Sequence, residues 1–409
     1  MITQFSVKNY KSIKDEICLD MSAASIHENE ASLIDRNGER YLPVSVIYGP
    51  NAGGKSNIID SLKVLVNMVV RPSLMQGGGN ITYVENLEVV PYGLSEENRE
   101  QPTEYELYFT AGVYEYKYCI AFKSKTVVYE YLYFRNPRTN RINAVFERDN
   151  GQIVMKGEFQ KLKIISDLSD EMPMLSYLGL MYSNNPVIGG AWKWFRYGII
   201  VARTETVNLV YPFSAGFDRN SEMKDRTLAM LKALDIDIDD FHVERNASGV
   251  DEVITVHSMD GYKMELRLDE ESTGTRKLFC LIPIFILNLM QGGTVVIDEL
   301  DAQIHPKLLE YFIQLFTTPS INRNGAQLIF SSHDLATMRN DIFRRDEIWF
   351  AAKGCHQNTG LYSLAEFKTE NGECPRANDS FMKSYLKGKY GADPYLQKII
   401  SWEDVEIDR

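Results

Sequence analysis

The sequence has few cysteines, and they form no recognisable metal-binding or disulfide pattern. Five are scattered along the 409 residues without a CxxC pair: Cys18, Cys119, Cys280, Cys355 and Cys374. An odd number of dispersed cysteines is poor material for a disulfide framework or a zinc site. His356 follows Cys355 directly, and a single adjacent pair of this kind is more typical of a loop than of a ligand set.

Long apolar runs are also scarce. The N-terminal stretch MITQFSVKNYKS lacks the apolar core of a signal peptide. The longest apolar stretch, LFCLIPIFILNLM at residues 278–290, is too short to span a bilayer. We therefore expect a soluble, cytoplasmic protein with no membrane contact.

The chain also has no excess of positive charge: its formal net charge is -12. Phosphate contacts need clustered Lys and Arg, so this balance disfavours a protein coated for nucleic-acid binding. One local basic groove is still compatible with it. With 44% hydrophobic residues, the chain can bury a large core, and its length favours roughly two or three domains.

The residue patterns predict an α/β fold. Residues 1–157 contain tyrosine-rich alternating stretches at 103–122 and 126–136, which are typical of antiparallel strands. Residues 158–241 have helical spacing and predict a helical insert. Residues 242–409 alternate strands with helices, which predicts a parallel core sheet. The expected elements there are a hairpin turning at 260–261, a helix at 274–290, a strand at 294–298, a helix at 306–316, a strand at 326–331 and a short tail.

A glycine-rich loop between a predicted strand and a predicted helix matches a phosphate-binding pattern. GPNAGGKS, from Gly49 to Ser56, fits GxxxxGK[ST] at every fixed position. Glycines let the backbone fold around phosphates, and the helix N-terminus adds positive potential. The pattern predicts that Lys55 reaches the β- and γ-phosphates of ATP and that the Ser56 hydroxyl binds Mg²⁺. The other predicted nucleotide-binding residues here are Gly49, Asn51, Ala52, Gly53, Gly54 and Asn57.

A second apolar strand ends in two acids, Asp298 and Glu299. Asp298 is predicted to bind Mg²⁺ through water, and Glu299 to polarise the attacking water. The alternative is that both acids only cap the next helix. The gap between Lys55 and Asp298 is too long for a small GTPase or a nucleotide kinase.

Two further segments could contact a γ-phosphate. In DEESTGTRKL, Ser272 and Gly274 open a predicted helix, whose N-terminus is an anion site. QLIFSSHD places His333 after a buried strand, where its ring could hydrogen-bond a phosphate oxygen. Taken alone, the helix N-terminus would be weak evidence for an anion site, and His333 would be better explained as an ordinary loop histidine.

The order of these motifs resembles the ABC-type ATPase heads of the SMC and DNA-repair group. It resembles more closely the AAA ATP-binding proteins of bacterial abortive-infection and phage-defence loci, which are relatives of the OLD-family ATPases. The segments that carry the resemblance are FSVKNYKSI, GPNAGGKSN, ESTGTRKL, VVIDELDAQIHP, LIFSSHD and SYLKGKYGADP. They span nearly the whole chain. The resemblance implies an ATPase that uses ATP and Mg²⁺.

The resemblance also implies roles for single residues. Ser272, Gly274 and Thr275 resemble the signature motif, which in such heads faces the ATP of a second subunit. Asp301 resembles the D-loop aspartate at the same interface. A homodimer or higher homo-oligomer, closed over ATP, is therefore implied.

Lys11 resembles a basic residue near the phosphates, and His333 resembles the switch histidine. The sequence departs from the family pattern in two places. Thr273 stands where a second adjacent glycine is usual, and the Q-loop glutamine is not assigned.

Three functions fit these observations. The first is an ATP-dependent switch for a separate effector, a nuclease or toxin, in anti-phage defence. It is favoured because we expect neither a nuclease domain after His333 nor a long coiled coil, since sustained heptads are absent. The second is an SMC-like or DNA-repair-like head that touches DNA through the basic stretches 134–141 and 383–389. The third is a scaffold with structural ATP, against which Glu299 argues.

The predicted helical insert at 158–241 is a candidate docking surface for the effector. It interrupts the ATPase segments, so a nucleotide-driven movement could shift it. The alternative is that it only covers an apolar sheet surface.

Overall fold

The computed structural model describes residues 1–76, 88–136, 138–165, 168–203, 219–247, 249, 251–354, 357–368, 375 and 379–392. The residues of the Cys355–His356 pair and Cys374 lie outside this set.

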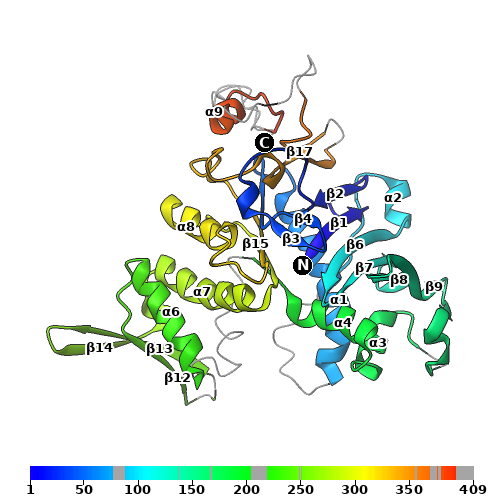
Figure 1. The fold of residues 1–409 in the computed structure, drawn as a ribbon, viewed down its shortest axis with the longest axis horizontal. Coiled ribbons are helices and arrows are strands. Elements are labelled where there is room, and N and C mark those ends of the chain that lie inside the picture. The colour runs from blue at the N-terminus through cyan, green and yellow to red at the C-terminus, as the bar shows by residue number, and fades with distance from the viewer. Residues whose placement is uncertain are drawn as a thin grey trace, which may run out of the picture.

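A six-stranded sheet forms the centre of the molecule (Figure 1). Its order is β11-β15-β16-β5-β17-β18, and all neighbours are parallel except β17 and β18. The three central strands are buried at every residue, as expected for continuous apolar runs in a parallel sheet. The strands are β5 (Val44–Tyr48), β11 (Ile199–Arg203), β15 (Thr294–Asp298), β16 (Gln327–Ser331), β17 (Ile348–Lys353) and β18 (Thr359–Ser363).

Helices pack on both faces of this sheet. Side chains alternate between the faces, so Ile47 and Ile329 join the cluster beneath α1 (Lys55–Gln76). Val46 and Phe330 join the cluster under α7 (Thr273–Gln291) and α8 (Pro306–Thr317). Among the described residues, α7 is the one helix long and apolar enough to cross a membrane. Most of it is buried against the sheet and neighbouring helices, as in a core helix.

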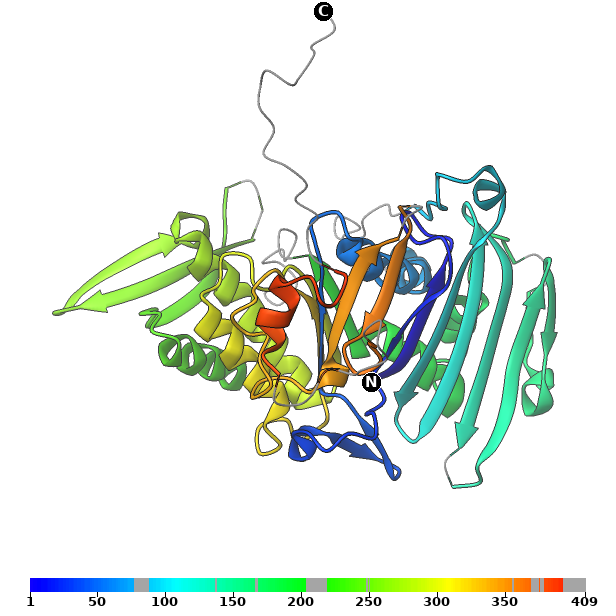
Figure 2. The same ribbon diagram turned by 90° about the horizontal axis from the view of Figure 1, so that it is seen from above.

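The predicted antiparallel sheet is present, with seven strands in the order β10-β9-β8-β7-β6-β1-β2. The tyrosine-rich stretches form β6, β7 and β8, which confirms their assignment. Figure 2 shows this sheet at one end of the molecule and the β13–β14 hairpin at the other. The strands are β1 (Ile2–Lys8), β2 (Ile17–Asp20), β6 (Thr103–Ala111), β7 (Tyr114–Lys123), β8 (Thr126–Asn136), β9 (Arg141–Asp149) and β10 (Gln152–Met155).

Two short helices, α3 (Met174–Met181) and α4 (Pro186–Lys193), cover one face of the antiparallel sheet. The carboxylate of Glu130 on β8 accepts hydrogen bonds from the backbone N–H groups of Met174 (2.5 Å) and Leu175 (2.9 Å). The Tyr116 hydroxyl on β7 donates to the Val187 carbonyl at 2.9 Å. α3 and α4 therefore cover apolar sheet surface, as the alternative interpretation of the insert predicted.

The prediction that residues 158–241 form a helical insert is wrong in part. This segment contains β11, an edge strand of the core sheet that pairs with β15. Its apolar run is too short to show a period, as is common for buried parallel strands. The segment also contains α6 (Ser221–Ala233), which packs on α7, and β12 (Asp240–Arg245), which pairs with β13 (Asp251–Met259).

The short tail expected after Ser331 is also wrong, because β17, β18 and α9 (Phe381–Leu386) follow. β17 completes the core sheet next to β5. The hairpin expected at 260–261 joins β13 to β14 (Tyr262–Arg267). The smaller elements are η1 (Glu30–Ser32), β3 (Ile34–Arg36), β4 (Glu39–Tyr41), α2 (Glu96–Glu100), η3 (Gly157–Lys161), η4 (Trp194–Gly198), η7 (Leu268–Glu270) and η8 (Arg345–Glu347).

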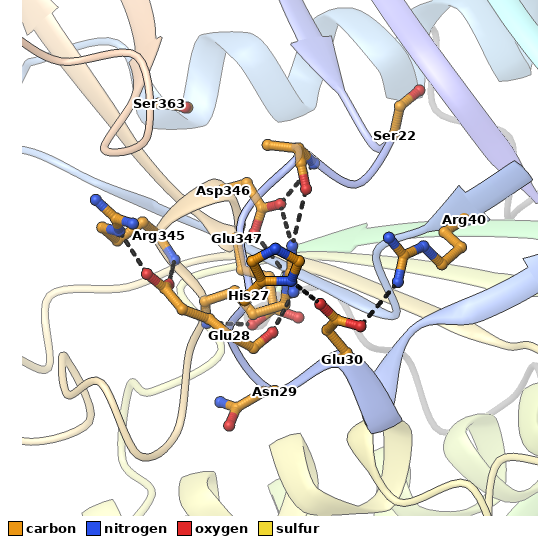
Figure 3. A network of polar contacts seen from close by, with 12 residues as sticks. Ser22, His27, Glu28, Asn29, Glu30, Arg40, Arg345, Asp346, Glu347 and Ser363 are labelled. Atoms are coloured by element: carbon orange, nitrogen blue, oxygen red, sulfur yellow. Dashed lines mark hydrogen bonds and ion pairs between the residues drawn. The ribbon is translucent and has the colours of Figure 1, made fainter. Parts of the chain in front are cut away.

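A buried polar network ties the segment after β2 to the start of β17, as Figure 3 shows. Arg344 is fully buried and pairs with Asp346 at 2.7 Å. Arg345 pairs with Glu28 at 2.6 Å. Glu347 is buried beside them, and burial raises its pKa to about 8. The network anchors the strand that lies next to the phosphate-loop strand.

Candidate nucleotide-binding site

The motifs predicted from the sequence converge on one edge of the core sheet. β5, β16 and β15 are adjacent and parallel, so their carboxyl ends meet at the same edge. The phosphate loop follows β5, Asp298 ends β15, and Ser331 ends β16. Segments that are far apart in the sequence are therefore neighbours in space.

The glycines of the phosphate loop are required by what packs against them. A Cβ on Gly49 would lie 2.1 Å from the Ala351 carbonyl oxygen, and one on Gly54 would lie 2.1 Å from the Thr359 Oγ1. Their φ angles, 151° and 105°, also disfavour any side chain. A Cβ on Gly53 would lie 2.8 Å from the same Ala351 oxygen. The loop is thus shaped by β17 and β18.

Lys55 is buried at the start of α1 and points back into the loop. Its ammonium group donates to the carbonyls of Gly49 (2.9 Å) and Pro50 (3.1 Å). Burial lowers its pKa, while the charges of Asp298 and the acids that follow it act in the opposite direction. The lysine therefore lies within the electrostatic field of the acids after β15, as the motif pairing predicts.

Ser331 holds the two predicted acids in place. Its hydroxyl donates to Asp298 Oδ1 at 2.5 Å and accepts the backbone N–H of Glu299 at 2.8 Å. Glu299 has a φ of 54°, a left-handed conformation that is strained for a residue with a side chain. Sequence reasoning missed Ser331, although it stands two residues before His333.

Lys277 is a second residue that sequence reasoning missed. It is buried on α7, one turn beyond Ser272, and its ammonium group donates to the carbonyls of Glu299 (3.3 Å), Leu300 (2.8 Å) and Ala302 (2.5 Å). Burial lowers the pKa of Lys277 to about 8, against the raising effect of nearby acids. It joins the signature-like helix to the loop that carries Glu299. A lysine that precedes an apolar run gives little sequence signal for this role.

His333 and Asp301 are brought together. The backbone N–H of His333 donates to Asp301 Oδ2 at 3.0 Å. The other oxygen, Oδ1, is buried and has no hydrogen-bond partner among the described residues. Burial lowers the pKa of His333, and the positive charge of Lys55 lowers it further. His333 and Lys55 therefore lie in the same site.

Lys11, which the resemblance places near the phosphates, is paired with a carboxylate in this structure. Its ammonium group forms an ion pair with Asp60 of α1 and lies over the Tyr10 ring, 5.3 Å from the centroid. A contact between Lys11 and phosphate would require this ion pair to break.

Asn57 does not point freely into the loop, because its amide donates to the Ser12 hydroxyl at 2.7 Å. That hydroxyl lies 2.7 Å from Thr359 Oγ1, which donates to the Gly53 carbonyl at 3.2 Å. Asn57 and Ser12 thereby brace the loop from outside.

The signature-like segment makes local contacts at the start of α7. The Ser272 hydroxyl caps the helix by accepting the Thr275 N–H at 3.1 Å, and it lies 2.8 Å from the Thr275 hydroxyl. A Cβ on Gly274 would meet the Gln303 carbonyl oxygen at 3.5 Å, an ordinary contact distance. This chain's own packing therefore gives no reason for a glycine at 274.

The residues at the sheet edge fit a Mg²⁺ ion. Ser56 lies in the first turn of α1 and Asp298 at the end of β15, and both supply the oxygen ligands that Mg²⁺ prefers. The described residues contain no cluster of three His, Cys, Asp or Glu that could hold a metal. Phosphate oxygens and water would have to complete the coordination, as is usual for Mg²⁺ with a nucleotide.

These features together define a P-loop nucleotide-binding domain: a glycine loop on a helix N-terminus, a buried lysine and an acid pair on a nearby parallel strand. The family described as "AAA domain, putative AbiEii toxin, Type IV TA system" matches residues 44–170 and 191–339. This covers more than half of the chain, and the chain belongs to this family.

Solved structures give weaker similarities. The SMC head domain from Thermotoga maritima is 15% identical with a TM-score of 0.42, covering 88% of this chain and 98% of that one. An SmcHead bound to the C-winged helix domain of ScpA is 13% identical with a TM-score of 0.42, covering 88% and 97%. At such scores these similarities carry no conclusion about activity or partners. No curated protein gives a significant match.

Proposed function

We propose that this chain is an ATP-hydrolysing head of the ABC type that acts as a nucleotide-dependent switch. It closes against a second copy over ATP and controls a separate effector, a nuclease or toxin, in anti-phage defence. The observation that carries the proposal is the meeting of Lys55, Asp298 and Glu299 at one sheet edge. The family description, which names a putative AbiEii toxin and a type IV toxin–antitoxin system, supports the cellular context.

The residues would divide the work of hydrolysis. Lys55 would exchange its two loop carbonyls for β- and γ-phosphate oxygens, beside the inward-pointing N–H groups of the loop. Mg²⁺ bound at Ser56 and Asp298 would neutralise developing negative charge. Glu299 would accept the proton of the attacking water. Ser331 and Lys277 would hold Glu299 in its strained conformation.

His333 would contact the γ-phosphate in its neutral form. Its lowered pKa favours an uncharged ring near Lys55, and a neutral imidazole still offers one N–H donor. Asp301 fixes the backbone beside it.

The signature-like turn would act on the ATP of the second copy. The exposed N-terminus of α7 offers backbone N–H groups and a positive dipole to a phosphate. Gly274 would then permit close approach of the second copy's nucleotide. Among the described residues, Oδ1 of Asp301 has no hydrogen-bond partner, so it would accept a hydrogen bond from a donor of the second copy.

Two substitutions test the catalytic assignment. Glu299→Gln should retain ATP binding and lower hydrolysis by about 10²–10⁴-fold, because an amide cannot accept the proton. Lys55→Ala should weaken ATP binding itself. Glu265→Gln, an exposed change on β14, serves as the control. Hydrolysis by Glu299→Gln at the wild-type rate would show that the assignment is wrong.

The effector assignment is tested in cells. The chain would be expressed alone and together with the products of adjacent genes, and the cells challenged with phage. We expect protection to require both an adjacent product and an intact Glu299. Protection by the chain alone, or nuclease activity of the purified chain that survives Glu299→Gln, would contradict a separate effector.

A further inference from the structure

The antiparallel sheet has two unlike faces. One face buries aromatic rings such as Phe109 of β6, against which Phe195 of η4 packs edge to face at 5.5 Å. The opposite face carries a groove of about 840 Å³ that runs over β1, β6, β7 and β8. The β3–β4 hairpin supplies one wall through Glu39 and Tyr41. The groove lies on a different sheet from the nucleotide site.

Strand register explains what lines the groove. Alternate residues of a strand point to the same face, so Tyr129, Tyr131 and Tyr133 follow one another along β8. Tyr131 is directly opposite Cys119, and Tyr133 is opposite Lys117. Tyr129 and Tyr131 stack, with ring centroids 5.3 Å apart and an interplanar angle of 12°. The result is a row of aromatic rings on a sheet surface.

The groove carries more negative than positive groups. Five carboxylates line it (Glu16, Glu39, Glu104, Glu106 and Glu115), against three cations (Lys8, Lys117 and Arg135). Each cation is already paired, for example Lys8 with Glu104 at 3.1 Å and Arg135 with Glu39 at 3.2 Å. Lys117 pairs with Glu106, and Arg135 also pairs with Glu115, so that among the described residues Glu16 alone of the five has no ion pair. With five carboxylates and three cations, the groove keeps a net charge of -2 for an outside ligand to neutralise.

One of the groove's own residues shows how it holds a cation. The Lys117 ammonium group lies 5.0 Å from the centroid of the Tyr108 ring and 2.9 Å from a carboxylate oxygen of Glu106. A tyrosine face and a carboxylate thus act together on one charge. Further along the row, the Tyr129 hydroxyl donates to Glu104 at 3.1 Å, which places another carboxylate beside a tyrosine ring.

We propose that this groove docks an extended basic segment of a partner protein. Arg and Lys side chains would stack on the tyrosine rings and pair with the surplus carboxylates. Four strands at about 4.8 Å spacing give the groove a length of roughly 15 Å, which matches about five residues of extended chain. A nucleic acid would place its phosphates against the carboxylates and is disfavoured.

The docking surface extends the proposed function, because a switch that controls a separate effector needs a contact for a partner. It differs from the docking surface predicted at 158–241, whose helices α3 and α4 are occupied in covering the sheet's other face. The ATPase site and the groove share no residue, so the two proposals can fail separately.

The test uses the full chain and three fluorescein-labelled probes: a Gly/Ser peptide with four interspersed Arg and Lys, the same peptide with Glu at those positions, and a single-stranded oligonucleotide. Fluorescence anisotropy is measured at low and at physiological salt. We expect binding of the basic peptide only, weakening as salt rises.

Two groove variants are compared with matched changes elsewhere. Tyr131→Ala and Glu16→Lys should each weaken peptide binding by roughly three- to tenfold. Tyr262→Ala and Glu265→Lys, on exposed positions of β14, should leave it unchanged. All four should hydrolyse ATP at the wild-type rate, and Glu299→Gln should still bind the peptide. Equal peptide affinity in groove and β14 variants, or equal binding of the acidic peptide or oligonucleotide, would overturn the proposal.

Discussion

The phosphate loop and the first turn of α7 are both glycine-containing segments at the N-terminus of a helix, and their surroundings differ. In the phosphate loop, a Cβ added at Gly49 or Gly54 would lie 2.1 Å from atoms of β17 or β18. At Gly274 on α7, an added Cβ would make only an ordinary 3.5 Å contact. The first segment is completed by this chain, whereas the second presents an exposed turn.

This difference separates two uses of glycine. In the phosphate loop, glycine is needed to build the fold, whether or not a nucleotide is bound. At position 274 the packing of this chain does not require glycine, which agrees with the proposed contact to a group of a second copy. A phosphate held by a second copy is the group that a helix N-terminus suits best.

Lys277 connects the two regions. It sits on the signature-like helix and binds three carbonyls of the loop that carries Glu299. A shift of α7 on closure over ATP would therefore move the loop that carries Glu299, the proposed catalytic base. The hydrogen bonds of Lys277 thus connect the proposed interface on α7 to the loop proposed to carry out hydrolysis.

The largest expected difference is between alanine substitutions at Gly54 and at Gly274. Gly54→Ala adds strain of about 1–3 kcal/mol to a steric overlap, so we expect at least a roughly hundredfold loss of ATP affinity. Gly274→Ala should leave stability within about 0.5 kcal/mol and monomer nucleotide binding unchanged. Titration with a fluorescent ATP analogue and thermal unfolding measure both. Equal damage from the two changes would remove the contrast.

A smaller effect is expected at the link between the regions. Lys277→Met leaves three carbonyls without their cation and should relax the strained Glu299, lowering hydrolysis by about tenfold while ATP binding persists. Lys307→Met, at an exposed position of α8, is the control. Steady-state hydrolysis and nucleotide titration separate the two effects. A parallel loss of binding and hydrolysis would indicate general damage instead.

A further effect concerns the pH dependence of stability. The pKa of Lys277, about 8 in the fold, lies below its ordinary value of 10.5. Between pH 8 and pH 10.5, Lys277 is protonated in the unfolded chain and deprotonated in the folded chain. Because the unfolded state binds more protons, the contribution of Lys277 makes the free energy of unfolding rise with pH. The unfolding free energy of wild type relative to Lys277→Met should therefore increase from pH 8 towards 10.5. Denaturant titrations across this range check the sign, and a decrease would contradict it.

The sequence patterns predicted the elements around the site better than those at its margins. β15 and the hairpin turn after β13 were found because alternation and motif are local signals. β11 and β17 were missed because short buried strands carry no period that separates them from their neighbours. Ser331 and Lys277 were missed because their role depends on which backbone atoms the fold brings near them. Lys11 was placed by resemblance alone, and the structure pairs it with Asp60.

In the proposed dimer, the signature-like turn of one copy completes the nucleotide site of another. Lys55→Ala damages the phosphate loop and spares the turn, whereas Gly274→Asp damages the turn and spares the loop. Each variant alone should be inactive. In a mixture, the intact loop of one meets the intact turn of the other, so hydrolysis should reappear at up to about a quarter of the wild-type rate for random pairing. A mixture as inactive as its components, although the two variants co-assemble with ATP, would contradict the claim.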